Sequence, residues 1–187
     1  MIKCIFIISL FIAASLFCGS EEELISGWEN RGVFQSSITR TNISPFDTLS
    51  ETGFIAIRKP DVLYSTENEF VLFVGKTLYL FSSDSDVGIK TEMEDFAYSD
   101  PSVLIDRLRE DFKLGYIPTD SGLIVSGREG LGNIIEFKAE LDRDYLPLDV
   151  SWTDIFGYRT ILHFIEPSLK DPGDIFIPPD SIEFIEQ

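Results

Sequence analysis

Residues 53–81 are GFIAIRKPDVLYSTENEFVLFVGKTLYLF, and this stretch decides the fold. β-Branched and aromatic residues dominate it, and Gly, Pro and Asn interrupt it, which is typical of short strands joined by turns. The pattern predicts strands at Phe54–Ile57, Val62–Ser65 and Phe70–Phe81, the last divided by a turn at Gly75-Lys76. The connections are too short for crossover helices, so these strands should pair antiparallel.

The last part of this stretch is apolar on both of its sides. Tyr79 and Phe81 alternate with Leu78 and Leu80, so neither face of the strand is simply polar. An antiparallel sheet with one face in water needs only one apolar face. The sequence therefore predicts a curved sheet whose second apolar surface is covered by a helix, a ligand or a lipid.

Further strands flank this stretch, and helices are predicted at two places. The remaining strands are expected at Val33–Thr41, Leu114–Ile117, Leu123–Ser126, Ile134–Glu140, Leu146–Thr153, Tyr158–Phe164 and Ile175–Ile177. A short helix is expected at Glu21–Asn30 and a clearer one at Asp100–Phe112, because Asp100 suits the N-cap and Pro101 the first turn. This gives a mainly β (α+β) domain of about eleven strands.

The N-terminal segment has the features of an export signal. Lys3 precedes the apolar run Ile5–Phe17, which is too short to span a bilayer comfortably, and the small residues Gly19-Ser20 follow. We therefore expect residues 1–20 to be a signal peptide and residues 21–187 to form a single domain, with an uncleaved anchor as the less favoured alternative. Cys18 lies where a lipoprotein cysteine would lie, although the residue before it is large. Lipidation of Cys18 and ordinary cleavage after Ser20 both remain open.

The charge balance argues against anionic partners. The chain has 32 acidic and 15 basic residues, a net charge of −17, so nucleic acid and anionic lipid headgroups should repel it. Both cysteines, Cys4 and Cys18, lie in the predicted signal peptide. The domain itself therefore offers no disulfide, no thiol nucleophile and no thiolate metal site.

No residue pattern indicates catalysis. The single histidine, His163, lies inside a predicted strand without partners that would make it a catalytic base. Phosphate-binding and nucleophile motifs are absent, and the many carboxylates are typical of a solvated acidic surface. Asp84 and Asp86 do not complete a calcium loop, because Ile89 stands where that loop needs glycine. We expect no enzymatic activity, no metal and no cofactor.

Several short motifs, taken in their order along the chain, resemble those of the LolA-type periplasmic lipoprotein carriers. The matching stretches are Gly32-Val33-Phe34-Gln35 (F-x-Q), Ile57-Arg58-Lys59-Pro60 (basic-basic-Pro), Gly75-Lys76-Thr77-Leu78-Tyr79 (D-G-K-T-L-W), Asp154 to Ile161 (D-x-x-G-x-x-T-x-I) and Phe176-Ile177-Pro178-Pro179 (F-x-P-P). The resemblance covers roughly Leu24 to Ile185. It departs from the family at Val74, which replaces the acid, and at Leu63 and Ser65, where the family has Trp and Phe.

The resemblance implies an unclosed, strongly curved antiparallel β-barrel with lid helices over its open mouth. It further implies a monomeric periplasmic carrier, or chaperone, that binds lipoprotein acyl chains in an apolar cavity and shuttles lipoproteins from the inner to the outer membrane. Its partners would be an inner-membrane lipoprotein-releasing transporter and an outer-membrane acceptor. The alternative on the same fold is a membrane-anchored, LolB-like acceptor or lipid-sensing domain, held through Cys18. A lipid hydrolase is disfavoured, because no nucleophile–base pair is evident.

The resemblance also assigns roles to individual residues. The expected lid helix presents Leu104, Ile105, Leu108 and Phe112, and the expected lipid cavity is lined by Phe34, Ile55, Ile57, Leu63, Leu72, Tyr79, Phe81 and Trp152. The lid latch would be Lys59 or Arg58, donating a hydrogen bond to carbonyls at a helix end. The family has arginine at the position of Lys59, and lysine lacks the planar fork of a guanidinium.

Overall fold

The computed structural model describes residues 32–93, 110–130 and 132–186, and its strands all belong to one sheet. The predicted signal peptide, the possible lipidation site Cys18 and the helix expected at Glu21–Asn30 lie outside the described residues. So do Leu104, Ile105 and Leu108 of the expected lid helix. No helix within the described ranges is long and apolar enough to cross a membrane.

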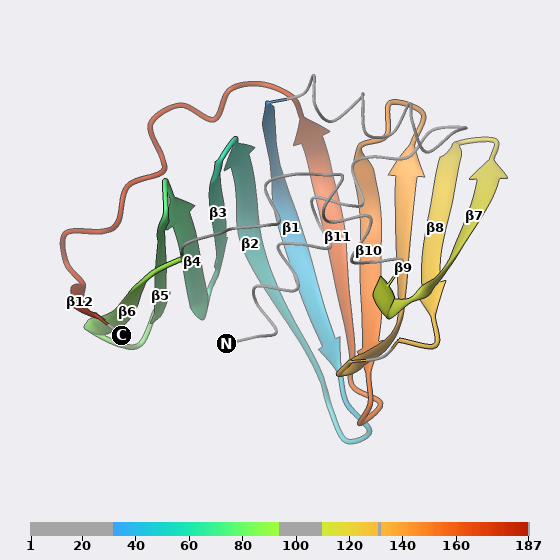
Figure 1. Ribbon diagram of the computed structural model, residues 1–187, viewed down its shortest axis with the longest axis horizontal. Helices are drawn as coiled ribbons and strands as arrows, with labels where there is room; N and C mark the ends of the chain where they lie inside the picture. Colours follow the sequence, from blue (N-terminus) through green and yellow to red (C-terminus); the bar gives the residue numbers. More distant parts are fainter. Residues whose placement is uncertain (1–31, 94–109, 131, 187) are drawn as a thin grey trace.

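The sheet has twelve strands, is curved and does not close on itself (Figure 1). Its strands are β1 (Val33–Ile43), β2 (Thr48–Arg58), β3 (Asp61–Thr66), β4 (Glu69–Val74), β5 (Thr77–Ser82), β6 (Val87–Glu92), β7 (Lys113–Thr119), β8 (Gly122–Arg128), β9 (Ile134–Asp142), β10 (Pro147–Asp154), β11 (Arg159–Ser168) and β12 (Glu183–Glu186). Their order across the sheet is β12-β6-β5-β4-β3-β2-β1-β11-β10-β9-β8-β7. The long strands β1 and β11 pair with each other near the centre of the sheet. Their pairing joins the half that contains β2 to β6 and β12 to the half that contains β7 to β10.

The mainly β, unclosed and curved sheet confirms the predicted fold class, with corrections at three elements. Ile175–Ile177 forms no strand, whereas β6 and β12 were not predicted. β12 pairs parallel with β6, so the sheet is antiparallel everywhere except at this edge. Both missed strands are short, and β12 forms because the chain returns to the free edge of β6, which local sequence does not reveal.

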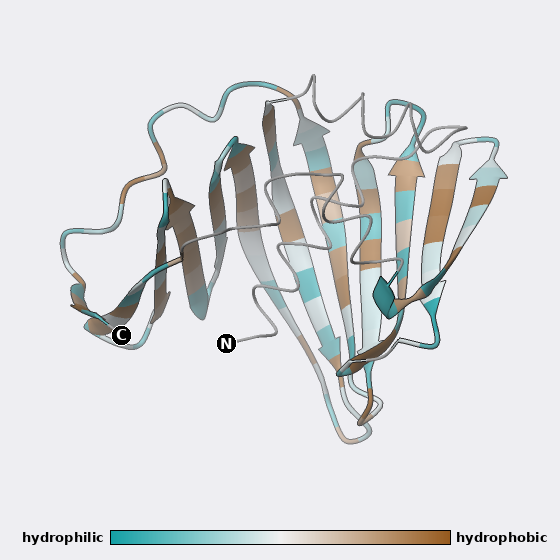
Figure 2. Cartoon of the chain, viewed as in Figure 1, coloured by the Kyte–Doolittle hydropathy of each residue, from teal (hydrophilic) through white to brown (hydrophobic). Residues whose placement is uncertain are grey.

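Side-chain alternation gives the sheet two faces, and the larger core lies on one of them. We call this the inner face. It brings together residues from both halves of the sheet. Figure 2 shows apolar bands on the strands of both halves. Its buried members are Phe34, Ile38, Ile55, Ile57, Val62, Tyr64, Val71, Phe73, Leu78, Phe112, Leu123, Val125, Ile134, Phe137, Ala139, Leu141, Val150, Trp152, Leu162 and Phe164.

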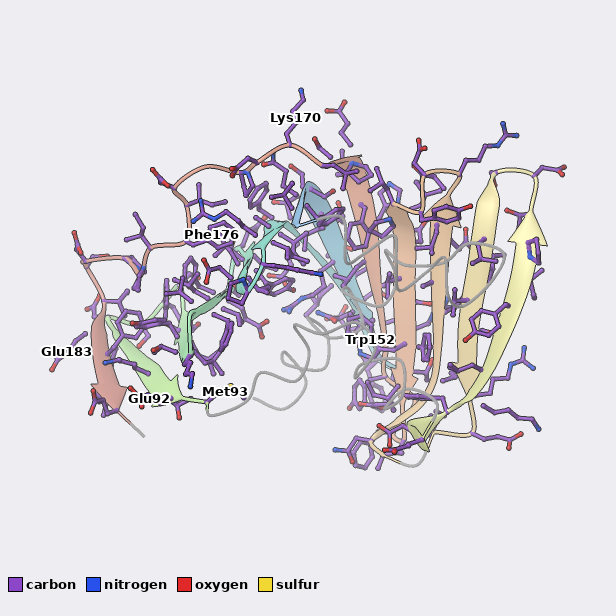
Figure 3. All side chains as sticks on the ribbon, turned by 45° about the horizontal axis from the view of Figure 1, so that its top comes forward. Glu92, Met93, Trp152, Lys170, Phe176 and Glu183 are labelled. Atoms are coloured by element: carbon purple, nitrogen blue, oxygen red, sulfur yellow. The ribbon has the colours of Figure 1, made fainter. Side chains whose placement is uncertain are left out.

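A smaller core lies on the opposite, second face, over β2 to β5. Here the buried residues Ala56, Leu63 and Leu72 pack against Phe176. Phe176 belongs to residues 169–182, which run from β11 to β12 and which we call the C-terminal strap (Figures 1 and 3). The strap therefore covers an apolar patch of the second face before the chain ends in β12.

Candidate apolar binding site

The eight residues predicted to line one cavity divide between the two faces. Phe34, Ile55, Ile57 and Trp152 belong to the inner-face core, whereas Leu63 and Leu72 belong to the smaller core, with Tyr79 packed against it. Phe81 is on the second face as well, since it is two residues from Tyr79 in the same strand.

The strand register explains this division. Ala56 pairs with Leu63, Leu63 with Leu72, and Leu72 with Tyr79, so these four residues form one row across β2 to β5. Directly paired residues share a face, and residues adjacent in sequence point to opposite faces. The row therefore faces away from the inner-face core, and a single cavity does not contain both sets.

Both sides of the sheet are apolar over β2 to β5 because another segment of the same chain covers the second face there. Phe176 is only 5% exposed, and Ile175 packs beside it. The rings of Phe70 and Phe81 stack at 4.5 Å, and Phe184 of β12 meets Tyr79 edge-on at 5.0 Å. The strap and β12 cover this patch, which makes the inner face the candidate site for an apolar ligand.

Arg58, one of the two predicted latch residues, holds the strap. Its Nη1 donates a hydrogen bond of 3.1 Å to the carbonyl oxygen of Gly173 and lies 3.7 Å from an Asp174 carboxylate oxygen. Its guanidinium carbon is 4.8 Å from the centre of the Phe176 ring. For Lys59, the backbone N–H donates to the Gly32 carbonyl at 2.9 Å. The observed clasp therefore fastens the strap to the second face, and the predicted lid latch remains a prediction.

Of the four residues expected on the lid helix, Phe112 is the one that the structure describes, and it lies on the inner face. Glu110 and Asp111 before it are helical, and Phe112 itself is buried in the inner-face core. Its ring meets the Phe137 ring edge-on at 5.0 Å. A Cβ at Gly127 would lie 3.0 Å from Cβ of Phe112, so the absence of a side chain at Gly127 permits this close approach.

A buried ionic network, which sequence reasoning missed, closes one end of the inner face. Nε of Arg40 donates to Glu51 at 2.6 Å, and its Nη1 donates to the Tyr64 hydroxyl at 3.0 Å and to Glu69 at 2.5 Å. Asn68 donates to the other oxygen of Glu51 at 3.0 Å.

The network keeps Arg40 charged inside the fold. Burial lowers the pKa of the guanidinium, but Tyr64, Glu69 and Glu51 outweigh burial and raise that pKa above its ordinary value. Arg40 therefore ties β1 to β2, β3 and β4 at a point where the inner face changes from apolar to polar. The alternating pattern of β1 could have indicated this network, because it places Arg40 on the same face as the apolar residues Phe34 and Ile38.

A cavity of about 350 Å³ adjoins this network at the end of the sheet. It is lined by Arg40, Asn42, Ile43, Ser44, Asp47, Leu49, Glu69, Trp152, Asp154, Tyr158, Arg159 and Thr160. Trp152 belongs both to this cavity and to the inner-face core, so the cavity leads from the ends of β1 and β10 toward that core.

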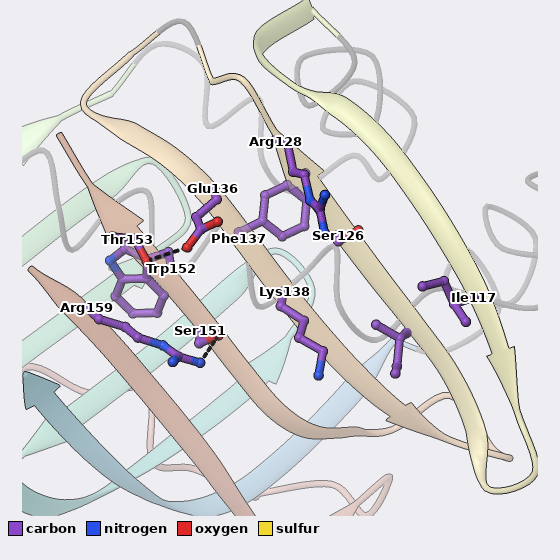
Figure 4. A pocket seen from close by; sticks show the side chains of 12 residues that line it. Ile117, Ser126, Arg128, Glu136, Phe137, Lys138, Ser151, Trp152, Thr153 and Arg159 are labelled. Atoms are coloured by element: carbon purple, nitrogen blue, oxygen red, sulfur yellow. Dashed lines mark hydrogen bonds between the residues drawn. The ribbon is translucent and has the colours of Figure 1, made fainter. Parts of the chain in front are cut away.

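Another cavity, of about 380 Å³, lies over β7 to β11 (Figure 4). It is lined by Ile117, Ile124, Ser126, Gly127, Arg128, Glu136, Phe137, Lys138, Ser151, Trp152, Thr153 and Arg159, most of them polar. Thr153 donates to Glu136 at 3.0 Å, and Arg159 donates to the Ser151 hydroxyl at 3.4 Å. Ser126, Lys138 and Ser151 pair directly across β8 to β10, so this cavity lies on the second face, opposite the inner-face core.

The described residues show little that suggests metal binding. His163 lies 3.0 Å from an Asp149 oxygen through its Nδ1, and both side chains are largely in solvent. Within residues 32–93, 110–130 and 132–186, no three His, Cys, Asp or Glu side chains gather in a way that could hold a metal ion.

Comparison with known proteins shows the fold. Neither a protein-family model nor a curated protein sequence matches the chain. Among solved structures, an uncharacterized conserved protein from Thermus thermophilus is similar, with a TM-score of 0.55 at 11% identity over 84% of this chain and 92% of that one.

Two further solved structures are similar over most of this chain. One is a LolA superfamily protein from Nitrosomonas europaea, with a TM-score of 0.40 at 9% identity over 91% of this chain and 96% of that one. The other is a putative outer membrane lipoprotein-sorting protein domain from Vibrio parahaemolyticus, with a TM-score of 0.38 at 9% identity over 75% and 86%.

Proposed function

We propose that the protein binds the acyl chains of lipoproteins on its inner face and carries them through the periplasm from the inner to the outer membrane. The observation that carries this proposal is the inner face itself. It is one continuous cluster of buried apolar residues across an open sheet, running from Leu78 on β5 to Val125 on β8. The protein would act by binding and release, without a chemical step.

The apolar surface is of a kind that stabilises a bound acyl chain. Each methylene group removed from water contributes about 0.8 kcal/mol, so a chain that buries about ten of them gains about 8 kcal/mol before the costs of association. The ionic network of Arg40, Glu51 and Glu69 bounds this surface at one end. Acyl chains would lie along the apolar part, with the polar part of the ligand toward an end of the sheet.

The inner face must open before such a ligand binds, because its core residues are buried. Phe112 occupies part of this face through its contact with Phe137. In the proposal, residues 101–112 act as the lid, and opening separates Phe112 from Phe137. Phe112 then competes with the acyl chain for the same surface.

A matched pair of substitutions tests which face binds the ligand. Phe112→Ala removes a large ring from the inner face, and Phe176→Ala removes one from the second face. Binding of a fluorescent fatty-acyl probe should be saturable and reversed by a triacylated lipopeptide. Phe112→Ala should tighten it several-fold because the competitor is gone, whereas Phe176→Ala should leave it unchanged. No saturable binding, or an equal effect of both substitutions, would contradict the proposal.

The state of Cys18 distinguishes the carrier from the anchored alternative. A carrier must leave the membrane, whereas an acylated cysteine together with a second membrane contact holds a protein there. Mass spectrometry of the protein purified from its native cells would show whether Cys18 is retained and acylated, and whether a lipopeptide copurifies. A retained, triacylated Cys18 would favour the LolB-like acceptor.

A further inference from the structure

Two hairpin turns lie side by side at one end of the sheet. One joins β1 to β2 through residues 44–47, and the other joins β10 to β11 through residues 155–158. Ile43 at the end of β1 pairs with Arg159 at the start of β11, so the two turns are neighbours (Figure 1, lower edge). Together with Leu49, we call these two turns the hairpin tip.

The hairpin tip exposes large apolar side chains. Phe46 is 94% exposed, Phe156 71%, Leu49 64%, Ile155 51% and Tyr158 46%. Single exposed apolar residues are common on protein surfaces, but four in two adjacent turns, with Leu49 beside them, form a patch that marks an interaction site.

Hydrogen bonds fix the shape of both turns. The Ser44 hydroxyl accepts hydrogen bonds from the backbone N–H groups of Phe46 and Asp47 at 3.2 and 2.9 Å. In the second turn, the buried carboxylate of Asp154 accepts from the N–H groups of Phe156 and Tyr158 at 2.9 and 3.0 Å. The apolar side chains are therefore held outward by ordered turns.

We propose that the hairpin tip inserts into the interface of a lipid bilayer with zwitterionic headgroups. Tyr is enriched at the boundary between headgroups and acyl chains, and Phe and Leu are typical of the apolar surface that inserts there. The exposed Asp47 and Arg159 contribute one charge of each sign at the tip, which suits headgroups of no net charge. The net charge of −17 on the whole chain disfavours an anionic membrane.

A bilayer fits the hairpin tip better than a second copy of the chain does. A stable protein–protein interface buries about 800 Å² on each partner in complementary, packed surfaces. Two small projecting turns offer little flat or concave surface for such packing. Shallow insertion into a fluid layer needs only that apolar side chains project together.

This inference goes beyond the proposed function and is tested independently of it. Leu49 and Tyr158 line the 350 Å³ cavity that leads toward Trp152 and the inner-face core. Insertion of the hairpin tip would therefore place the mouth of that cavity at the membrane surface, where a carried lipid has to leave or enter.

The test is a local fluorescence measurement on the full chain. Phe156→Trp places a reporter in the hairpin tip, and Ile177→Trp places one at a control site in the strap that is also exposed, at 63%. With phosphatidylcholine vesicles, Phe156→Trp should gain a blue-shifted emission that brominated phosphatidylcholine quenches, relative to the unsubstituted chain. Ile177→Trp should gain neither. Because the signal is local, it reports on the tip whether or not the N-terminus is anchored.

A loss-of-binding variant complements the reporter. Phe46→Ser with Phe156→Ser should lower vesicle partitioning about tenfold or more, because both rings that the bilayer would bury are removed. Acyl-probe affinity should stay unchanged, which separates a failure here from a failure of the proposed function. An emission of Phe156→Trp that vesicles do not alter overturns the inference. So does a blue shift that depends on protein concentration without vesicles, because the tip would then bind a second copy.

Discussion

Substitution of Arg58 by Leu should loosen the C-terminal strap while leaving the sheet folded. Arg58 donates to the Gly173 carbonyl at 3.1 Å and lies over the Phe176 ring at 4.8 Å. Leucine keeps part of the apolar contact but removes both of these interactions.

The magnitude follows from these two interactions. A hydrogen bond from a charged donor contributes about 1.5–3 kcal/mol, and the lower end applies because the Arg58 side chain is 35% exposed. A cation–π contact at a partly exposed site adds about 0.5–1 kcal/mol. The ion pair with the almost fully exposed Asp174 adds little. A loss of about 2 kcal/mol increases the population of detached strap roughly thirtyfold.

Proteolysis by chymotrypsin at Phe176 measures that population. Phe176 is buried in the closed strap, so cleavage requires detachment, and its rate follows the open fraction when opening is fast. Arg58→Leu should speed cleavage at Phe176 about thirtyfold, with a much smaller change in the urea midpoint of the whole domain. Arg58→Lys should give an intermediate rate, because lysine keeps the charge without the planar fork.

A distant arginine serves as the control. Arg143 also donates to a backbone carbonyl, that of Asp120, but on the other half of the sheet. Arg143→Leu should leave cleavage at Phe176 unchanged. If Arg58→Leu does the same, the clasp does not hold the strap and the reasoning fails.

Two further predictions concern the sheet. Arg40→Met should lower the free energy of unfolding by about 3–5 kcal/mol, because Glu51 stays buried without its cation. Arg40→Met combined with Glu51→Gln should lower it by less. If urea denaturation shows no recovery of stability in the double variant, the pairing of Arg40 with Glu51 is contradicted. Gly122→Ala should destabilise the domain by about 1–3 kcal/mol, because a Cβ there would lie 2.0 Å from the Leu141 carbonyl oxygen. Gly132→Ala, where nothing lies within 4 Å of the added Cβ, should have little effect in the same measurement.

Local sequence is enough to predict the features that depend on neighbouring residues. Alternation and turn residues located most strands, including the turn at Gly75-Lys76 between β4 and β5 and the turn after Asp154 between β10 and β11. Asp154 is also visible in sequence as a turn residue, because a carboxylate accepts hydrogen bonds from N–H groups two and four residues later. Such local signals act within a few residues and need no knowledge of the fold.

Which apolar residues share a surface depends instead on the assembled sheet. Leu63 and Leu72 resemble Ile55 and Ile57 in every local respect, yet strand register places the two pairs on opposite faces. The choice of Arg58 for the strap depends on residues more than a hundred positions later, and Arg40 finds its partners on three other strands. β12 forms because the chain returns to the edge of β6. These pairings are non-local, and their free energy comes from surfaces that exist only after the sheet has assembled.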